Sequence, residues 1–114
     1  MMETKARRLF YFVDGQGEAP FENWLSSIKN PTTLKRIQSR LLRLESGNFG
    51  DCKYLDQGVN ELRLFFGPGY RVYFGEDENV LVVLLCGGDK SSQGKDIALA
   101  KQYWQEYLWQ RKEQ

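Results

Sequence analysis

The chain of 114 residues contains no histidine, only two cysteines and only three prolines. Without histidine, any acid–base chemistry must use lysine, tyrosine, aspartate, glutamate or water. The longest apolar run covers residues 80–86, far short of the ~20 residues that a membrane span needs. The sequence therefore predicts no membrane protein, and residues 1–114 fit a single domain.

The sequence also lacks an excess of either charge, because 16 lysines and arginines are balanced by 15 acidic residues. A net charge of +1 means that any contact with RNA or DNA must come from a local patch. Cys52 and Cys86 lie in strand-like segments without further ligands at metal spacing, so we expect two reduced thiols, no metal site and no cofactor. Residues 1–8 are polar and charged, which predicts no secretory signal and a cytoplasmic protein.

The first part of the chain predicts a strand followed by two helices. Residues 7–13 are rich in leucine, phenylalanine and tyrosine, which favours a strand. Pro20 suits the first turn of a helix, and apolar residues then recur at helical spacing. Asn30 and Pro31 fit the N-cap and first position of a second helix. Residues 20–46 therefore predict a helical hairpin.

From residue 51 onward apolar residues recur at every second position, which predicts strands. The strand candidates are a short one at 52–55 and longer ones at 60–66, 70–74 and 80–86. The last of these is apolar throughout and should be a central strand covered on both faces. Residues 87–94 are polar and predict a loop, and a helical stripe follows from Ile97 to Leu108. The predicted fold is α+β in the order β-α-α-β-β-β-α, a small, mostly antiparallel sheet packed by a helical hairpin and a C-terminal helix.

The hairpin around residues 67–69 is the first candidate for a functional surface. If Phe66 pairs with Tyr70, six apolar residues share one face, which should be core. The pairs on the other face are then Phe65 with Arg71 and Arg63 with Tyr73. Two guanidiniums, a phenol and aromatic rings suit a phosphate clamp with base stacking, although a solvated strand face carries similar residues.

Two further segments are candidates. Residues 86–92, Cys-Gly-Gly-Asp-Lys-Ser-Ser, lead from the central strand into the last helix, where glycines permit close approach and Lys90 adds a mobile charge. A strand-to-helix turn capped by Ser92 accounts for the same residues. Arg36, Arg40 and Arg43 line one face of the second helix and are candidates for RNA contact, although a solvated helix face accounts for them too.

Several of these segments together resemble a known family. They are residues 61–63 (Glu-Leu-Arg), 67–74 (Gly-Pro-Gly-Tyr-Arg-Val-Tyr-Phe), 84–93 (Leu-Leu-Cys-Gly-Gly-Asp-Lys-Ser-Ser-Gln) and 95–97 (Lys-Asp-Ile). Residues 44–51 and the early Pro-Phe and Trp-Leu pairs match as well. The sequence resembles the phage-derived, HigB-like addiction module killer proteins of the RelE/ParE toxin superfamily, over about residues 10–107.

This resemblance implies a RelE-like fold and the toxin of a type II toxin–antitoxin system. It also implies a cognate antitoxin, often a small helix-turn-helix protein. RelE-like and HigB-like toxins cut mRNA in the ribosomal A site, so ribosome and mRNA would be partners and translation would stop. ParE-like toxins instead poison DNA gyrase and cut nothing, and an inactive binding relative is a third alternative.

If the chain is a metal-independent endoribonuclease, four residues are candidates for catalysis. Arg63 and Arg71 would clamp the phosphate, Lys90 would add charge or act as acid or base, and Tyr73 would orient or donate. Phe65 and the arginines of the second helix would contact RNA. HigB-type toxins use histidine in the site, and its absence here leaves the general base unassigned.

Overall fold

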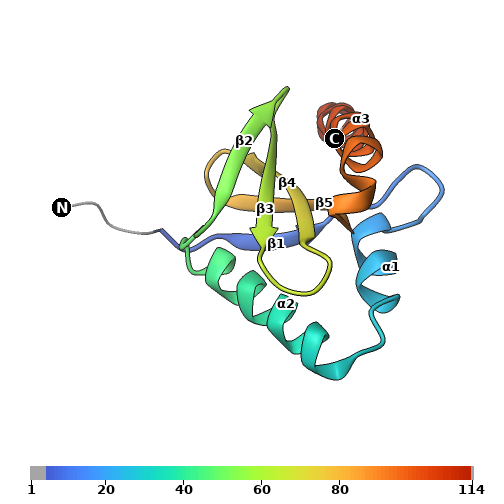
Figure 1. Ribbon diagram of the computed structural model, residues 1–114. Helices are drawn as coiled ribbons and strands as arrows, with labels where there is room; N and C mark the ends of the chain where they lie inside the picture. The colour runs from blue at the N-terminus through green and yellow to red at the C-terminus, as the bar shows by residue number, and fades with distance from the viewer. Residues whose placement is uncertain (1–4, 114) are drawn as a thin grey trace.

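The computed structural model describes residues 5–113 as three helices and a five-stranded mixed sheet (Figure 1). The elements are β1 Arg8–Tyr11, α1 Pro20–Ser26, α2 Pro31–Glu45, β2 Cys52–Asp56, β3 Val59–Leu64, β4 Tyr70–Asp77, β5 Leu81–Asp89 and α3 Gln93–Lys112. A 3-10 turn at Lys90–Ser92 leads into α3. No helix in this part of the chain is long and apolar enough to cross a membrane. The polar segment 1–8 lies partly outside the described residues.

The predicted helical hairpin is confirmed, and its second helix begins where the sequence indicated. The Asn30 side chain accepts hydrogen bonds from the backbone N–H groups of Thr32 at 2.9 Å and Thr33 at 3.1 Å. Pro31 occupies the first turn, where its missing N–H removes no helical hydrogen bond. These two features determine where α2 begins, and Ile37 and Leu44 pack it against one face of the sheet.

The strands lie in the order β1-β5-β4-β3-β2, with β1 parallel to β5 and all other pairs antiparallel. β5 lies inside the sheet and its side chains are buried on both faces, which confirms the prediction of a covered central strand. Val82 and Leu84 pack toward one face, and Val83 and Leu85 pack toward the other.

Two apolar cores result, one on each face of the sheet. Helices α1 and α2 cover the first with Phe21, Ile37 and Leu44. Helix α3 covers the second, where Trp104 and Tyr107 pack against the strands. Figure 1 shows α3 on the side of the sheet away from α2. In this three-layer arrangement the turn between β3 and β4 is exposed at Phe65.

The strand prediction needs two corrections. The order contains four strands after the helices, because the short segment at Cys52–Asp56 pairs with β3 as β2. Residues 87–94 are not a loop, since β5 continues to Asp89 and α3 begins at Gln93. Gly87 and Gly88 stay in the strand because they pair with Val72 and Arg71 of β4.

The predicted register of the β3–β4 hairpin is wrong by two residues. Leu64 pairs with Tyr70, and Arg63 pairs with Arg71. The turn takes up five residues, because the Phe66 N–H donates to the carbonyl of Leu64 at 3.0 Å and the Phe66 carbonyl accepts from Gly69 at 3.2 Å. A shift of two leaves every side chain on its predicted face, so the assignment of the core face is confirmed.

Candidate functional site

A buried carboxylate, Glu61 of β3, lies at the centre of the candidate site. It is completely buried and accepts hydrogen bonds from three side chains. Arg63 Nε donates to Oε1 at 3.0 Å, while Tyr73 Oη and Gln93 Nε2 donate to Oε2 at 3.1 and 2.8 Å. Arg71 Nε lies 4.0 Å from Oε2. One carboxylate therefore joins β3, β4 and the start of α3.

These contacts determine the charge states within the cluster. Burial alone would raise the pKa of the Glu61 carboxyl, but the three hydrogen bonds and the charge of Arg63 outweigh it and hold that pKa below its ordinary value. Burial, followed by the adjacent Glu61 charge and hydrogen bond, raises the pKa of the Tyr73 phenol far above its ordinary value. The cluster thus contains an anionic carboxylate and a neutral phenol at neutral pH.

Arg71 is held in place at the start of β4. Its side chain is mostly buried, with 8% of the residue exposed. Nη1 donates to the backbone carbonyls of Gly69 at 3.1 Å and Tyr70 at 3.2 Å. Nε has no hydrogen-bond partner among residues 5–113. The guanidinium is therefore oriented by its own turn and by the charge of Glu61.

The four predicted catalytic residues separate into two groups. Arg63 and Lys90 remain at least partly exposed, whereas Arg71 is mostly buried and Tyr73 is completely buried under α3. The expectation that the Tyr73 phenol lies on an accessible surface is therefore wrong. The strand face that carries it is covered by Trp104 and its neighbours on α3, so Tyr73 contacts Glu61 and not solvent.

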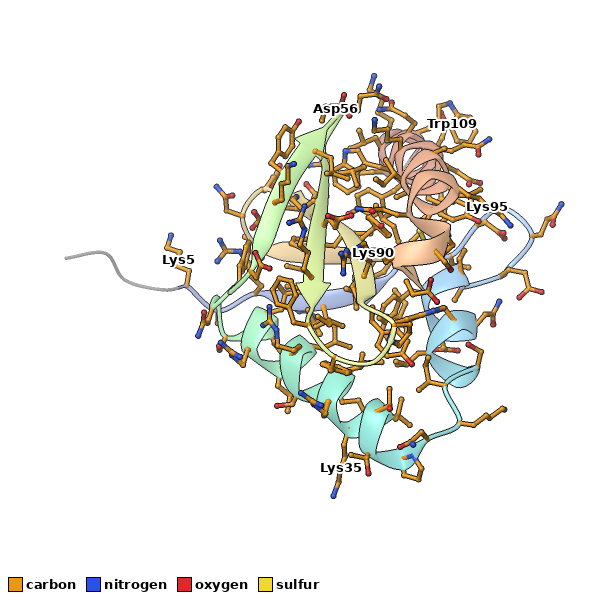
Figure 2. All side chains as sticks on the ribbon, viewed as in Figure 1. Lys5, Lys35, Asp56, Lys90, Lys95 and Trp109 are labelled. Carbon is orange, nitrogen blue, oxygen red and sulfur yellow. The ribbon has the colours of Figure 1, made fainter. Side chains whose placement is uncertain are left out.

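Arg71 and Lys90 come together at a groove beside the turn, named here the hairpin groove. It has a volume of about 450 Å³ and is lined by Phe65, Phe66, Gly67, Pro68, Gly69, Arg71 and Lys90. Lys90 is exposed, and Figure 2 shows it at the front of the molecule near β4 and β5. The groove thus offers one rigid and one mobile cation to an anionic ligand.

A second groove lies between α2 and the end of β3 and is named here the α2–β3 groove. It has a volume of about 400 Å³ and is lined by Arg36, Ser39, Arg40, Arg43, Gly50, Asp51, Arg63, Leu64, Phe65 and Phe66. All three predicted α2 arginines therefore share a groove with Arg63. The two grooves meet at Phe65 and Phe66, which line both.

Sequence reasoning missed Glu61 and Gln93. An acidic residue in an alternating strand ordinarily faces solvent, so the sequence does not predict that Glu61 is buried. One signal was available: Glu61 lies two residues before Arg63 and so shares its face of the strand. Gln93 carries no such signal, because its approach to Glu61 depends on how α3 packs on the sheet.

The two cysteines are free, as the sequence predicted. Burial and the charge of Glu76 raise the pKa of the half-buried Cys52 thiol to about 11. Burial and the charge of Asp96 raise that of Cys86 to about 12. Both thiols are therefore protonated and unreactive at neutral pH.

No protein-family model matches the chain. A protein of Haemophilus influenzae, described only as an uncharacterized protein, is 52% identical to it over 86 residues. The matched region covers 75% of this chain and 87% of the relative.

Proposed function

The chain belongs to the same family as this Haemophilus influenzae protein, and we propose that it is the toxin of a type II toxin–antitoxin pair. We further propose that it is a HigB-like member of the RelE/ParE superfamily that cuts mRNA on the ribosome. One observation carries the proposal: Arg71 and Lys90 line a groove beside the exposed Phe65 ring, and Arg63 is held by the same carboxylate that faces Arg71.

The fold supports this proposal. A RelE-like toxin places a helical hairpin against a small sheet, and α1 and α2 take that place here. The segments that carry the family resemblance also meet in space, because residues 61–63, 67–74 and 84–93 form β3, β4 and β5 with their connections. These three segments therefore lie side by side in the sheet.

The proposed reaction is cleavage by the neighbouring 2′-hydroxyl. The 2′-oxygen forms a bond to phosphorus and the bond from phosphorus to the 5′-oxygen breaks, leaving a 2′,3′-cyclic phosphate and a 5′-hydroxyl. Arg63 and Arg71 stabilise the added negative charge on the phosphorus oxygens, and each such donor contributes about 10²–10³ in rate. Lys90 protonates the leaving 5′-oxygen. Water takes the 2′-proton, because Glu61 and Tyr73 are buried.

A second function has one observation in its favour. Tyr73 and Glu61 are completely buried and the chain has no histidine, so of the two predicted acid–base residues, Lys90 and Tyr73, Lys90 alone is exposed. A ParE-like gyrase poison needs no acid–base residues, because it acts by binding. In both alternatives a cognate antitoxin would neutralise the protein by covering the active surface.

Expression without the antitoxin distinguishes these functions. The chain is induced tightly in a bacterium and mRNA 5′ ends are mapped after growth stops. We expect new ends within translated frames, lost in Arg71→Ala and in Lys90→Ala but kept in Lys35→Ala, which changes an exposed lysine outside both grooves. Lys90→Ala removes an exposed side chain, so we expect the variant to fold, and thermal unfolding checks this. Arrest with a DNA damage response and no new ends would favour gyrase, and no arrest would contradict both.

A further inference from the structure

The α2–β3 groove is strongly basic although the protein as a whole is nearly neutral. Four of the residues that line it are arginines and one, Asp51, is acidic. Among residues 5–113, none of the three α2 arginines forms an ion pair. Such a concentration of unpaired guanidiniums in a concave surface favours a ligand with several negative charges.

Arg40 adds a more specific requirement. Its Nη2 donates to the carbonyl of Phe49 at 3.0 Å, which holds the guanidinium at the floor of the groove beside Gly50. Its Nη1 is buried and has no hydrogen-bond partner in the described part of the chain. A buried guanidinium N–H without a partner is costly, so Arg40 lines the groove with one hydrogen-bond donor that the described residues leave unsatisfied.

The rim of the groove offers a flat aromatic surface. Phe65 is 74% exposed and lines both grooves. Beside it, the Arg36 guanidinium already stacks on Phe66, with its carbon 4.1 Å from the ring centroid. An exposed ring between two cationic grooves suits an unpaired base whose neighbouring phosphates lie on either side.

We propose that the α2–β3 groove binds the backbone of single-stranded RNA, with one base stacked on Phe65 and the strand continuing into the hairpin groove. The choice of RNA rests on the proposed function. Single-stranded RNA fits better than a duplex because the bases of a duplex are stacked on one another and cannot reach Phe65. It fits better than an acidic peptide because only a nucleic acid supplies phosphates and flat rings together.

The test uses an RNA that cannot be cleaved, so that binding is measured apart from chemistry. A fluorescein-labelled octamer of 2′-O-methyl uridine is titrated with the full chain, and fluorescence anisotropy reports the Kd. We expect Arg43→Ala to weaken binding about tenfold and to reduce the slope of log K against log salt by about 0.7. We expect Phe65→Ala to weaken binding about 5- to 100-fold.

Two matched variants control for charge and for aromatic area. Lys35→Ala removes a cation from the same helix, and Trp109→Ala removes an exposed ring from α3. Figure 2 shows both side chains pointing outward from the molecule, and neither residue lines the two grooves. Both variants should bind the octamer as the unchanged chain does, within about twofold.

Three results would overturn the inference. The first is that Arg43→Ala or Phe65→Ala binds the octamer as tightly as the two control variants do. The second is equal affinity for the octamer and for its duplex with a complementary strand. The third is binding of hexaglutamate, lost in Arg43→Ala, without binding of the octamer, which would assign the groove to a protein partner. Growth arrest without octamer binding would contradict this inference alone, and octamer binding without arrest would contradict the proposed toxin alone.

Discussion

The two faces of the sheet are built differently, although both are buried. The face under α1 and α2 is apolar along its length, with Leu62, Val72 and Phe74 packed against the helices. The face under α3 is apolar near Trp104 but contains Glu61, Arg71 and the Tyr73 hydroxyl at its other end. The hairpin groove adjoins this polar end at Arg71, and the α2–β3 groove reaches it at Arg63.

The two faces therefore contribute differently to the protein: one contributes mainly to stability, and the other mainly holds charged groups in place. An apolar face gains stability from area and tolerates changes that preserve volume. A buried charge cluster gains little net stability, but removing one member leaves the others unpaired. The face under α3 therefore keeps cations at fixed positions near solvent, and we expect it to respond to loss of charge where the other face responds only to loss of volume.

Replacing the central carboxylate should have the largest effect. Glu61→Leu keeps the approximate volume but leaves Arg63, Tyr73 and Gln93 without their acceptor. We expect a loss of about 3–5 kcal/mol in the free energy of unfolding, measured by urea titration at pH 7. Leu62→Met, on the opposite face of the same strand, should cost less than about 1.5 kcal/mol. Equal losses in the two variants would mean that the two faces do not differ.

Glycines under the two tryptophans should have the next largest effect. A Cβ on Gly75 would lie 2.4 Å from the Trp104 ring, and one on Gly87 would lie 2.3 Å from the Trp24 ring. Trp104 is buried, whereas Trp24 is partly exposed and therefore has more room to shift. We expect Gly75→Ala to cost about 1–3 kcal/mol in the free energy of unfolding and Gly87→Ala to cost less.

Thermal unfolding of the two glycine variants measures this difference. Gly94→Ala is the matched control, because a Cβ there meets no atom within 4 Å. It should be neutral or slightly stabilising. A larger loss in Gly87→Ala than in Gly75→Ala would show that the α1 side is the more rigid one.

The smallest effect concerns pH. The pKa of Glu61 lies below its ordinary 4.5, so its ionised form stabilises the fold at neutral pH. This stability should be lost as pH falls from about the ordinary value through the lower folded value. Glu61→Gln should lack that part of the acid dependence, whereas Leu62→Met should keep it. Urea titrations between pH 7 and pH 3 measure it, and identical pH profiles for all three proteins would contradict the assignment.

The sequence predicted the helices and strands better than the pairing of the strands and the burial of their side chains. The period of two and the apolar run at 80–86 indicated the strands, because these patterns depend only on neighbouring residues. The pairing of Leu64 with Tyr70 depends on hydrogen bonds within the turn, which composition does not reveal. The burial of Tyr73 depends on α3, which covers a face that alternation alone leaves open.

In the candidate site, too, the residue types could be predicted from the sequence, whereas their arrangement in space could not. Arg63, Arg71 and Lys90 were identified from their residue types, which suit phosphate chemistry wherever they lie. That Arg36, Arg40 and Arg43 share a groove with Arg63 required the packing of α2 against the end of β3. One sequence feature did bear on Tyr73: the apolar stripe of α3 needs an apolar sheet face, and β5 offers one beside β4.

The parallel pairing of β1 with β5 has a consequence for synthesis. Arg8 pairs with Leu81 and Tyr11 with Leu84, so the first strand made has its partner near the end of the chain. Contacts between distant residues form late, because loop-closure entropy opposes them until the intervening chain is ordered. A nascent chain therefore leaves the ribosome with β1 unpaired, and folding finishes only after translation of β5. The sheet is therefore completed by one of the last segments of the chain to be made, not by its first strand.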